Sequence, residues 1–405
     1  MSRFLNNKKI SPLLFSRYLI IFEFISILFS PALTNLFEIF LFASCLAFKE
    51  PRIAIWDSRS QPLFIGSVAF ILTLMISTAW CVAPFTEALN SLWGWRKILL
   101  LPISIALFQE AAWKEKTLKI FIIFMLSASV ISYAMFILGV SVHGWEPGVI
   151  IRNHATQGMV FSIAAFSIFT KLVSATTKLE KPEIDLLMLA VLALEINVAV
   201  TPGRSGYLVL LTVLAVSLVN LNATYKKINP ALMFLALIIP PLIPFSPIAS
   251  ETISKGVTEI RKVDEIAAPT SMGQRVKLWE NTIDMIKEKP LLGVGLGGFE
   301  KVYSEKMKNA PEWQKNILHD PHNQFLKIVA ELGLIGLLPF LYMLVTAILQ
   351  RPSSKDHRVL GLGVLLAWCG TSMFSSHFST FTEGRFIFIW LGVMLASSSS
   401  SKLKN

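Results

Sequence analysis

The sequence contains few charged residues and very few cysteines. Charged residues make up 16% of the 405-residue chain, whereas a soluble domain carries about 25%. The three cysteines, Cys45, Cys81 and Cys369, form no CxxC pair, which argues against a disulfide framework and a thiolate zinc site. The chain has no P-loop, so ATP hydrolysis by that route is excluded.

Long apolar runs dominate the chain instead. Hydrophobic residues make up 54% of it, and the mean hydropathy is +0.60. A helix that crosses a bilayer needs about 20 mostly apolar residues. We therefore predict an all-α, polytopic membrane protein with about 12 transmembrane helices. The predicted helices lie near residues 17–30, 32–48, 62–80, 96–109, 118–140, 155–171, 184–200, 204–220, 229–247, 323–350, 358–376 and 384–399.

The Lys and Arg residues of the short loops predict the orientation in the membrane. With the N-terminus inside, most of them lie inside, and the short outside segments hold Arg96, Lys97, Arg152, Arg204 and Arg385. We therefore predict that both termini are cytoplasmic. The net charge of +11 follows from this distribution, so we do not expect a nucleic-acid partner.

One long loop divides the chain into residues 1–247, the loop 248–321, and residues 322–405. A loop of this length in a compact protein is usually functional. Within it, apolar residues at helical spacing predict an amphipathic helix that ends before Pro290. A glycine-rich turn, "GVGLGGF", and a charged helical segment near 299–309 follow. The apolar residues of the amphipathic helix are Met272, Val276, Trp279, Ile283 and Ile286.

Four arginines lie outside in unusual settings. Arg204 lies in "TPGRSGYL", Arg152 in "IRNHATQG" and Arg275 in "MGQRVKLWE", and Arg385 opens the last helix. Each of them could simply extend to the lipid headgroups. Together, and with His322 on the same side, they favour an anion site, because Arg carries a permanent, forked charge that suits phosphate.

The stretch "ILHDPHNQFLKIVAELGLIG" places polar residues at the start of a predicted membrane helix. Asp320 is expected as the N-cap and Pro321 as the first helical residue, so that His322 and Asn323 lie in the first turn. The helix dipole would disfavour a charged imidazole there, and a neutral His322 could act as a general base. The alternative is a histidine that only caps the helix or forms a hydrogen bond at the interface.

Two further charges lie on the same predicted helix. Glu331 is expected to form a structural contact with a neighbouring helix, with Lys327 as its partner or as part of a cavity wall. His319, Asp320 and His322 could in principle bind zinc, but the sequence has no HExxH motif and no further ligand nearby. We therefore predict no metal and no cofactor.

These residues resemble the O-antigen ligase family of the O-antigen ligase and polymerase superfamily. "HNQFLKIVAELGLIG" is similar to its histidine signature, and "GQRVKLWENTIDMIKEKPLLGVGLGGF" to its loop block. "TPGRSGYL" and "RNHATQG" are similar to two earlier blocks, although many relatives have Ser where this chain has Gly203. The resemblance spans nearly the whole chain, with the strongest motifs between about residues 150 and 335.

The resemblance implies a glycosyltransferase of GT-C-like architecture in the inner membrane of a Gram-negative bacterium, with a periplasmic active site. The donor would be a polysaccharide on undecaprenyl pyrophosphate, and the acceptor a sugar of lipid A–core, with membrane lipids around both. His322 would be the catalytic base, without metal or ATP, and the anomeric carbon would be inverted. The pyrophosphate would be bound by Arg204, Arg275, Arg152, Lys262 and Arg385, and Asn323, Asp320, His319 and Glu331 would support the site.

Three alternatives stay open at this point. An O-antigen polymerase has the same donor chemistry, and a protein O-oligosaccharyltransferase differs in its Ser or Thr acceptor. A transporter of anionic lipids would also explain helices and arginines, but it would more naturally show two repeated halves, and the sequence contains no repeat.

Overall fold

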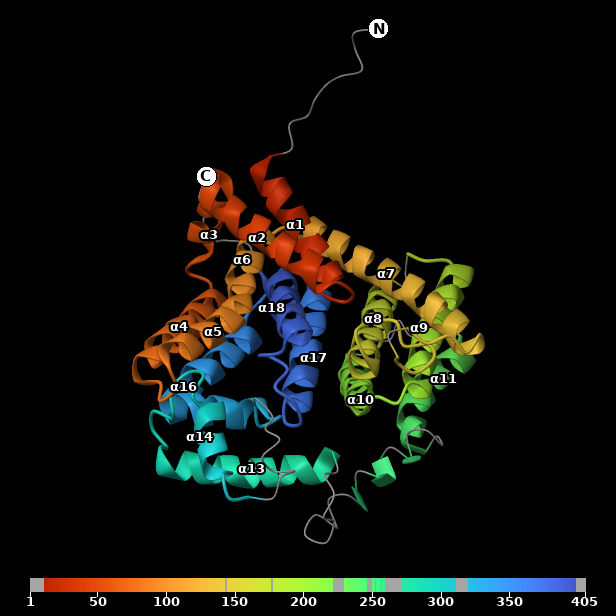
Figure 1. Ribbon diagram of the computed structural model, residues 1–405. Coiled ribbons are helices and arrows are strands. Elements are labelled where there is room, and N and C mark those ends of the chain that lie inside the picture. Colours follow the sequence, from red (N-terminus) through yellow and green to blue (C-terminus); the bar gives the residue numbers. More distant parts are fainter. Residues whose placement is uncertain are drawn as a thin grey trace.

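The computed structural model describes residues 11–397 except 143, 176–177, 221–228, 246–249, 252, 256, 259–270 and 311–319. The described residues form helices and connecting segments, without a strand among them, which confirms the all-α prediction. Figure 1 shows the order of the helices along the chain. They are α1 (Pro12–Ser26), α2 (Pro31–Ala47), α3 (Lys49–Ser58), α4 (Pro62–Ser77), η1 (Thr78–Trp80), α5 (Phe85–Trp95), η2 (Arg96–Leu99), α6 (Leu100–Leu107), α7 (Ala111–Ile137), α8 (His154–Ala175), α9 (Lys181–Val200), α10 (Arg204–Val219), α11 (Pro230–Leu242), η4 (Ile243–Phe245), α13 (Ser271–Glu288), α14 (Phe299–Lys306), α16 (Gln324–Leu349), α17 (Lys355–Thr371) and α18 (Phe381–Leu395).

Each predicted transmembrane segment coincides with one or more of these helices. Four helices are long and apolar enough to cross a membrane within the described part of the chain, namely Pro62–Trp80, Ala111–Ile137, His154–Ala175 and Gln324–Leu349. The pair α2 and α3 would be a fifth such span, bent by 87°. Several other apolar helices are shorter, so the count of about 12 spans stays a prediction.

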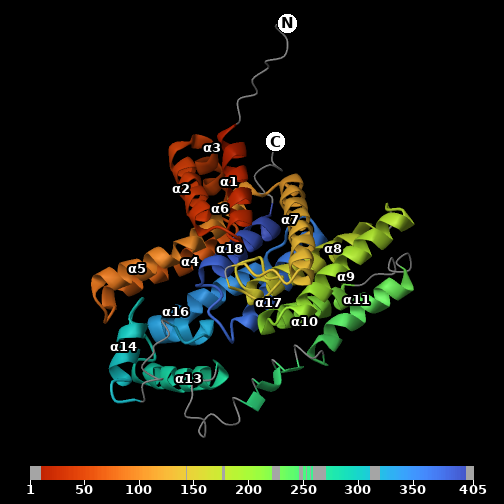
Figure 2. The same cartoon turned by 45° about the vertical axis from the view of Figure 1, so that its right-hand side comes forward.

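Helices α8 and α10 pack closely against each other. Gly158 of α8 and Gly206 of α10 face each other, and a Cβ on Gly206 would lie only 2.8 Å from the Cα of Gly158. Small residues at matching positions allow two membrane helices to approach closely. The pair belongs to a group, α8 to α11, in which α8 and α10 pack against α17 (Figure 2).

The close approach brings together the N-terminal ends of α8 and α10. A Cβ on Gly203, the N-cap of α10, would lie 2.9 Å from the carbonyl oxygen of His154, the first residue of α8. A side chain at position 203 would therefore press against the backbone of α8. Arg204 therefore starts α10 directly beside the start of α8.

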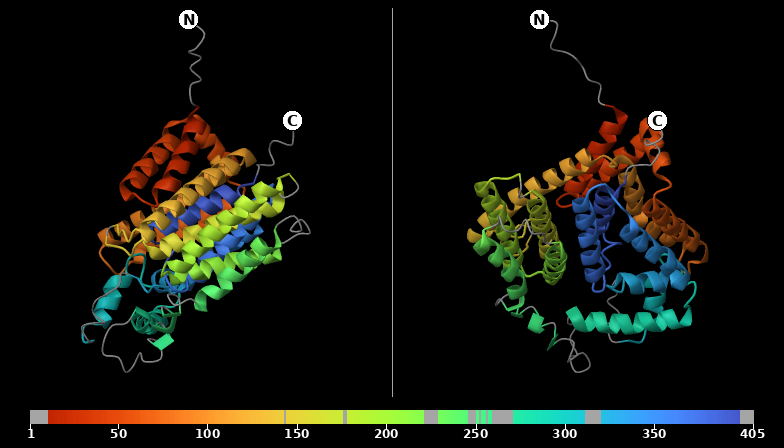
Figure 3. Two further views of the ribbon diagram at one scale, coloured as in Figure 1. Left: turned by 90° about the vertical axis from the view of Figure 1, so that its right-hand side faces the viewer. Right: turned by 180° about the vertical axis from the view of Figure 1, so that it is seen from behind.

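Helices α13 and α14 lie across one end of the molecule, and α1, α2 and α3 lie at the other (Figures 1 and 3). Helices α13 and α14 confirm the two helical segments that we predicted in the long loop. The predicted buried face of α13 is wrong in part, because Ile283 is exposed. Leu278 and Met285 are buried instead, since α14 packs against them through Phe299 and Tyr303.

The glycine-rich turn packs against a break in α16. Gly333 interrupts the helix with a φ of 66°, which only glycine adopts readily. The N–H groups of Val294 and Gly295 donate to the carbonyls of Ala330 and Glu331, at 2.9 and 2.8 Å. The turn thus satisfies backbone groups that the break leaves without helical partners.

Candidate functional site

His322 lies just before α16 rather than in its first turn. The N-cap is Asn323, whose Oδ1 accepts from the N–H groups of Phe325 and Leu326. The prediction of Asp320 as the N-cap is therefore wrong, since His322 has a φ of 49° that does not belong to a helix. Asp320 Oδ1 instead accepts the backbone N–H of His322 at 2.8 Å. This local hydrogen bond stabilises a left-handed conformation that non-glycine residues rarely adopt.

The surroundings of His322 favour its neutral form. Burial lowers the pKa of His322 below its usual 6.5; the Asp320 carboxylate opposes this effect, and the charges of Arg275 and Lys327 add to it. Burial would raise the pKa of Asp320, but Lys327 and His322 outweigh it and lower that pKa. The sequence predicted a neutral His322 because of the helix dipole. In the structure the neutral form is instead favoured by burial and by the charges of Arg275 and Lys327.

Helix α13 carries Arg275 to this segment. The indole N–H of Trp279 donates to the carbonyl of Pro321 at 2.8 Å, and the Trp279 ring packs on Phe374, with 6.1 Å between centroids. The tryptophan thus joins the long loop to the residues before α16 and after α17. Arg275, one turn earlier on α13, lies close enough to His322 for its charge to lower the pKa of the imidazole.

A cavity of about 560 Å³ lies among α8, α10, α13 and the connection between α17 and α18. Arg204 and Arg275 line it, together with Asn153 from the start of α8. Two arginines from distant parts of the sequence therefore face one space. Its size is within the range typical of pockets for organic ligands.

The guanidinium groups of Arg152 and Arg385 both lie over the Phe381 ring. Their guanidinium carbons are 5.6 and 4.0 Å from the ring centroid. Arg152 is exposed and, like His322, has a positive φ, of 51°. Neither arginine lines the cavity of Arg204 and Arg275.

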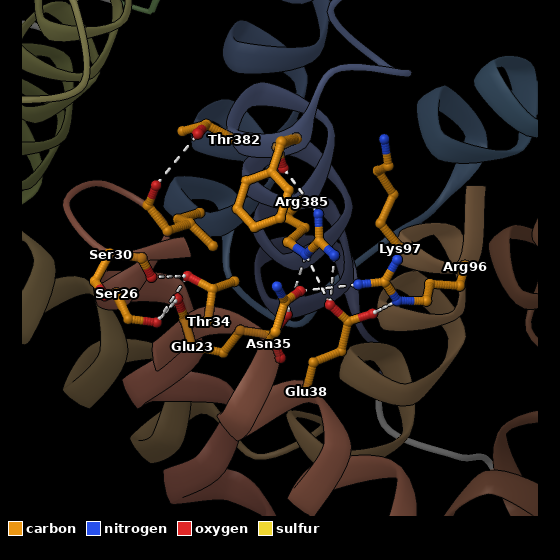
Figure 4. A network of polar contacts seen from close by, with 12 residues as sticks. Glu23, Ser26, Ser30, Thr34, Asn35, Glu38, Arg96, Lys97, Thr382 and Arg385 are labelled. Carbon is orange, nitrogen blue, oxygen red and sulfur yellow. Dashed lines mark hydrogen bonds and ion pairs between the residues drawn. The ribbon is translucent and has the colours of Figure 1, made fainter. Parts of the chain in front are cut away.

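Arg385 belongs to a buried network of charges (Figure 4). Its Nε and Nη2 lie 2.8 and 2.6 Å from Oε2 of Glu38, and Arg96 Nε lies 2.9 Å from Oε1 of the same carboxylate. Glu23 lies 3.9 Å from Arg385. The buried residues Glu23 and Glu38 therefore lie with arginines, and the charge of Arg385 is already matched by Glu38.

Four further residues of the sequence prediction are Lys262, His319, Glu331 and Lys327. Lys262 and His319 lie outside the described residues. Glu331 is buried and its Oε1 accepts the N–H of Gly297 at 3.2 Å, so its partner is the glycine-rich turn and not a neighbouring helix. Lys327 Nζ lies 3.7 Å from Oδ2 of Asp320 and thus supports the segment before α16.

The sequence interpretation missed His377 and Glu383. Both line the cavity of Arg204 and Arg275. A signal was present, because "SSHFSTFTEGR" places a histidine and a glutamate in the connection between two apolar runs. That connection was predicted to lie on the same side as His322.

Comparison with known proteins relates part of the sequence to one family. Residues 188–341 match the family model described as O-antigen ligase. Residues 188–341 belong to the O-antigen ligase family. This O-antigen ligase segment contains Arg204, Arg275 and His322, whereas Arg152, His377 and Glu383 lie outside it.

Three individual relatives match parts of this chain. A Rickettsia felis protein named as a candidate polysaccharide ligase is 26% identical over 254 residues, which are 55% of this chain and 62% of the relative. A similarly named Rickettsia conorii protein is 34% identical over 97 residues, 23% of each chain. A Haemophilus influenzae protein without a functional name is 32% identical over 81 residues, 20% of each chain. The matches thus span less than two thirds of each relative.

Proposed function

We propose that the protein is an O-antigen ligase that transfers polysaccharide from undecaprenyl pyrophosphate to a sugar hydroxyl of lipid A–core, on the periplasmic face of the inner membrane. The observation that carries the proposal is the cavity in which Arg204 and Arg275 meet, because both belong to the O-antigen ligase segment. Two fixed guanidinium groups suit the two phosphates of such a donor.

In this proposal Arg204 and Arg275 bind the pyrophosphate of the donor. As the bond between the anomeric carbon and the phosphate oxygen breaks, its electron pair moves to the pyrophosphate. The departing group gains negative charge, which fixed arginines stabilise. Arg152 lies just before α8 and is a further cation beside the N-terminal end of that helix.

His322 acts as the general base. The acceptor hydroxyl forms a bond to the anomeric carbon while its proton moves to the neutral imidazole. One attack from the face opposite the pyrophosphate inverts the anomeric carbon. His322 is not among the residues that line the cavity, but the charge of Arg275 lowers its pKa, which supports a base close to the anion site. Asp320 accepts a hydrogen bond from the backbone N–H of His322.

The test removes the gene from its host and restores it as wild type, His322→Ala or His357→Gln. His357 is a matched control because it is buried at the other end of the helices, with its Nε2 2.8 Å from Glu115. We expect polysaccharide on lipid A–core with wild type and control. When the His322→Ala protein is present in the membrane at the same level as the wild type, we expect lipid A–core without polysaccharide. The polymer should then remain on the lipid carrier.

Other results would assign another function. Core bearing one repeat unit in the deletion strain would identify a polymerase. Unchanged polysaccharide on core in that strain would exclude the ligase. Normal transfer by His322→Ala would show that another group is the base.

A further inference from the structure

The connection between α17 and α18 is held firmly in place. Gln324 Oε1, at the start of α16, accepts from the N–H groups of Phe378 and Ser379, both at 3.1 Å. Lys97 Nζ donates to the carbonyl of Thr380 at 2.9 Å. His377, between these contacts, is therefore on a fixed segment and cannot easily turn away from its surroundings.

His377 lies in the wall of the cavity, and both of its ring nitrogens are buried. Its side chain lines the cavity, and the residue is only 6% exposed. Neither ring nitrogen forms a hydrogen bond with any residue of the described part of the chain. Burial lowers the pKa of His377, so its ring is neutral and offers one donor and one acceptor. Buried polar atoms without partners are costly, and a ligand that matched both would remove that cost.

Glu383 gives the same part of the cavity a negative charge. Its Oε1 accepts from the hydroxyl of Thr156 at 2.5 Å, which fixes the carboxylate between α8 and α18. A carboxylate repels a pyrophosphate and accepts hydrogen bonds from uncharged hydroxyl groups. The cavity thus has a cationic part, with Arg204 and Arg275, and a part suited to neutral hydroxyls, with His377 and Glu383.

We propose that His377 and Glu383 bind hydroxyl groups of the sugar that is attached directly to the pyrophosphate of the donor. The proposal rests on the proposed function, since that sugar is the group next to the phosphates held by Arg204 and Arg275. A hexose hydroxyl both donates and accepts, which matches a neutral imidazole and a carboxylate. Phe374 lines the same cavity and offers an apolar surface beside these polar groups. His377 and Glu383 are then residues that select the donor sugar.

The test measures binding of two probes to the purified full-length protein in lipid nanodiscs. One probe is a prenyl pyrophosphate, and the other is the same lipid carrying a disaccharide. The variants are His377→Leu, His377→Gln and Glu383→Gln, with His357→Gln as the buried-histidine control and Arg204→Ala for the anion site. Thermal unfolding of each variant establishes that it folds.

We expect His377→Leu to bind the glycosylated probe about 10-fold more weakly, the effect of a lost buried hydrogen bond. His377→Gln should recover part of this loss, because its amide also donates and accepts. Binding of the bare prenyl pyrophosphate should not change in either variant. Glu383→Gln should weaken the binding of the glycosylated probe. It should bind the bare prenyl pyrophosphate as tightly as the wild type or more tightly, since a negative charge is removed. Arg204→Ala should weaken the binding of both probes.

Three results would overturn the proposal. Equal weakening of both probes in His377→Leu would place His377 at the pyrophosphate or in the general fold. Unchanged binding of both probes in His377→Leu would show that His377 does not contact the donor sugar. Binding of neither probe by the wild type would overturn the proposed function itself, and this failure is seen without any variant.

Discussion

Asp320 Oδ1 accepts a hydrogen bond of 3.0 Å from the hydroxyl of Ser376. The same oxygen accepts the backbone N–H of His322. One carboxylate therefore joins the segment before α16 to the connection that carries His377. The two histidines, 55 residues apart in the sequence, are held by a shared contact and not by neighbouring helices alone.

The first prediction concerns the pH dependence of Asp320→Asn. A general base is active when neutral, so activity falls as the pH drops through its pKa. Because the pKa of wild-type His322 is below 6.5, the fall should lie below that pH. The Asp320 charge raises this pKa, so Asp320→Asn should move the fall to still lower pH while the amide oxygen keeps the hydrogen bond to His322.

The measurement is kcat/KM for transfer across the acidic pH range. Asp284→Asn is the control, because Asp284 is an exposed residue of α13 whose partner is Lys287. A shift of the acid limb to higher pH in Asp320→Asn would contradict the role of His322.

The second prediction concerns the buried ion pairs of Glu38. Glu38→Gln removes the charge that pairs with both Arg96 and Arg385. Removing one partner of a buried pair costs about 3–5 kcal/mol, because a buried charge is left uncompensated. We expect a clear fall in the melting temperature of the purified protein.

Glu110→Gln is the matched control for Glu38. The Glu110 carboxylate pairs with Arg17 at 2.6 Å, but its side chain is 59% exposed. Its loss should cost less than about 1 kcal/mol. Similar melting temperatures for the two variants would show that the Glu38 network does not stabilise the fold.

The third prediction concerns the break in α16. Gly333→Ala forces a Cβ onto a residue with positive φ, where it would meet the carbonyl oxygen of Leu291. Strain of this kind costs about 1–3 kcal/mol, and the clash adds to it. We expect less folded protein and a lower melting temperature. Gly370→Ala, whose Cβ would meet nothing nearer than 3.9 Å, should fold normally.

The fourth prediction concerns Gly203→Ser. The added Cβ would lie 2.9 Å from the carbonyl of His154, so α8 and α10 must separate at their N-terminal ends. Arg204 would move relative to Asn153 across the cavity. We expect several-fold lower transfer with a smaller effect on folding. Transfer at the wild-type rate would show that the ends of the two helices adapt to serine.

Local patterns in the sequence determined the class of fold, because apolar runs and turn residues act over short distances. They predicted the helices of the long loop, the cations Arg204 and Arg275, and the polar segment around His322. They did not predict the burial of Leu278 and Met285, which depends on α14 and so on contacts between distant residues.

The tertiary structure alone decided which charges meet. Arg385 and Arg204 both follow short connections between apolar helices in the sequence, yet Arg385 pairs with Glu38 of α2 while Arg204 lines the cavity. His377 comes to line the cavity by the same route, because only the packing of α8, α10 and α13 around its connection forms a cavity there. Sequence spacing fixes which residues share a helix, whereas the partner of a buried charge is chosen by helices far apart in the chain.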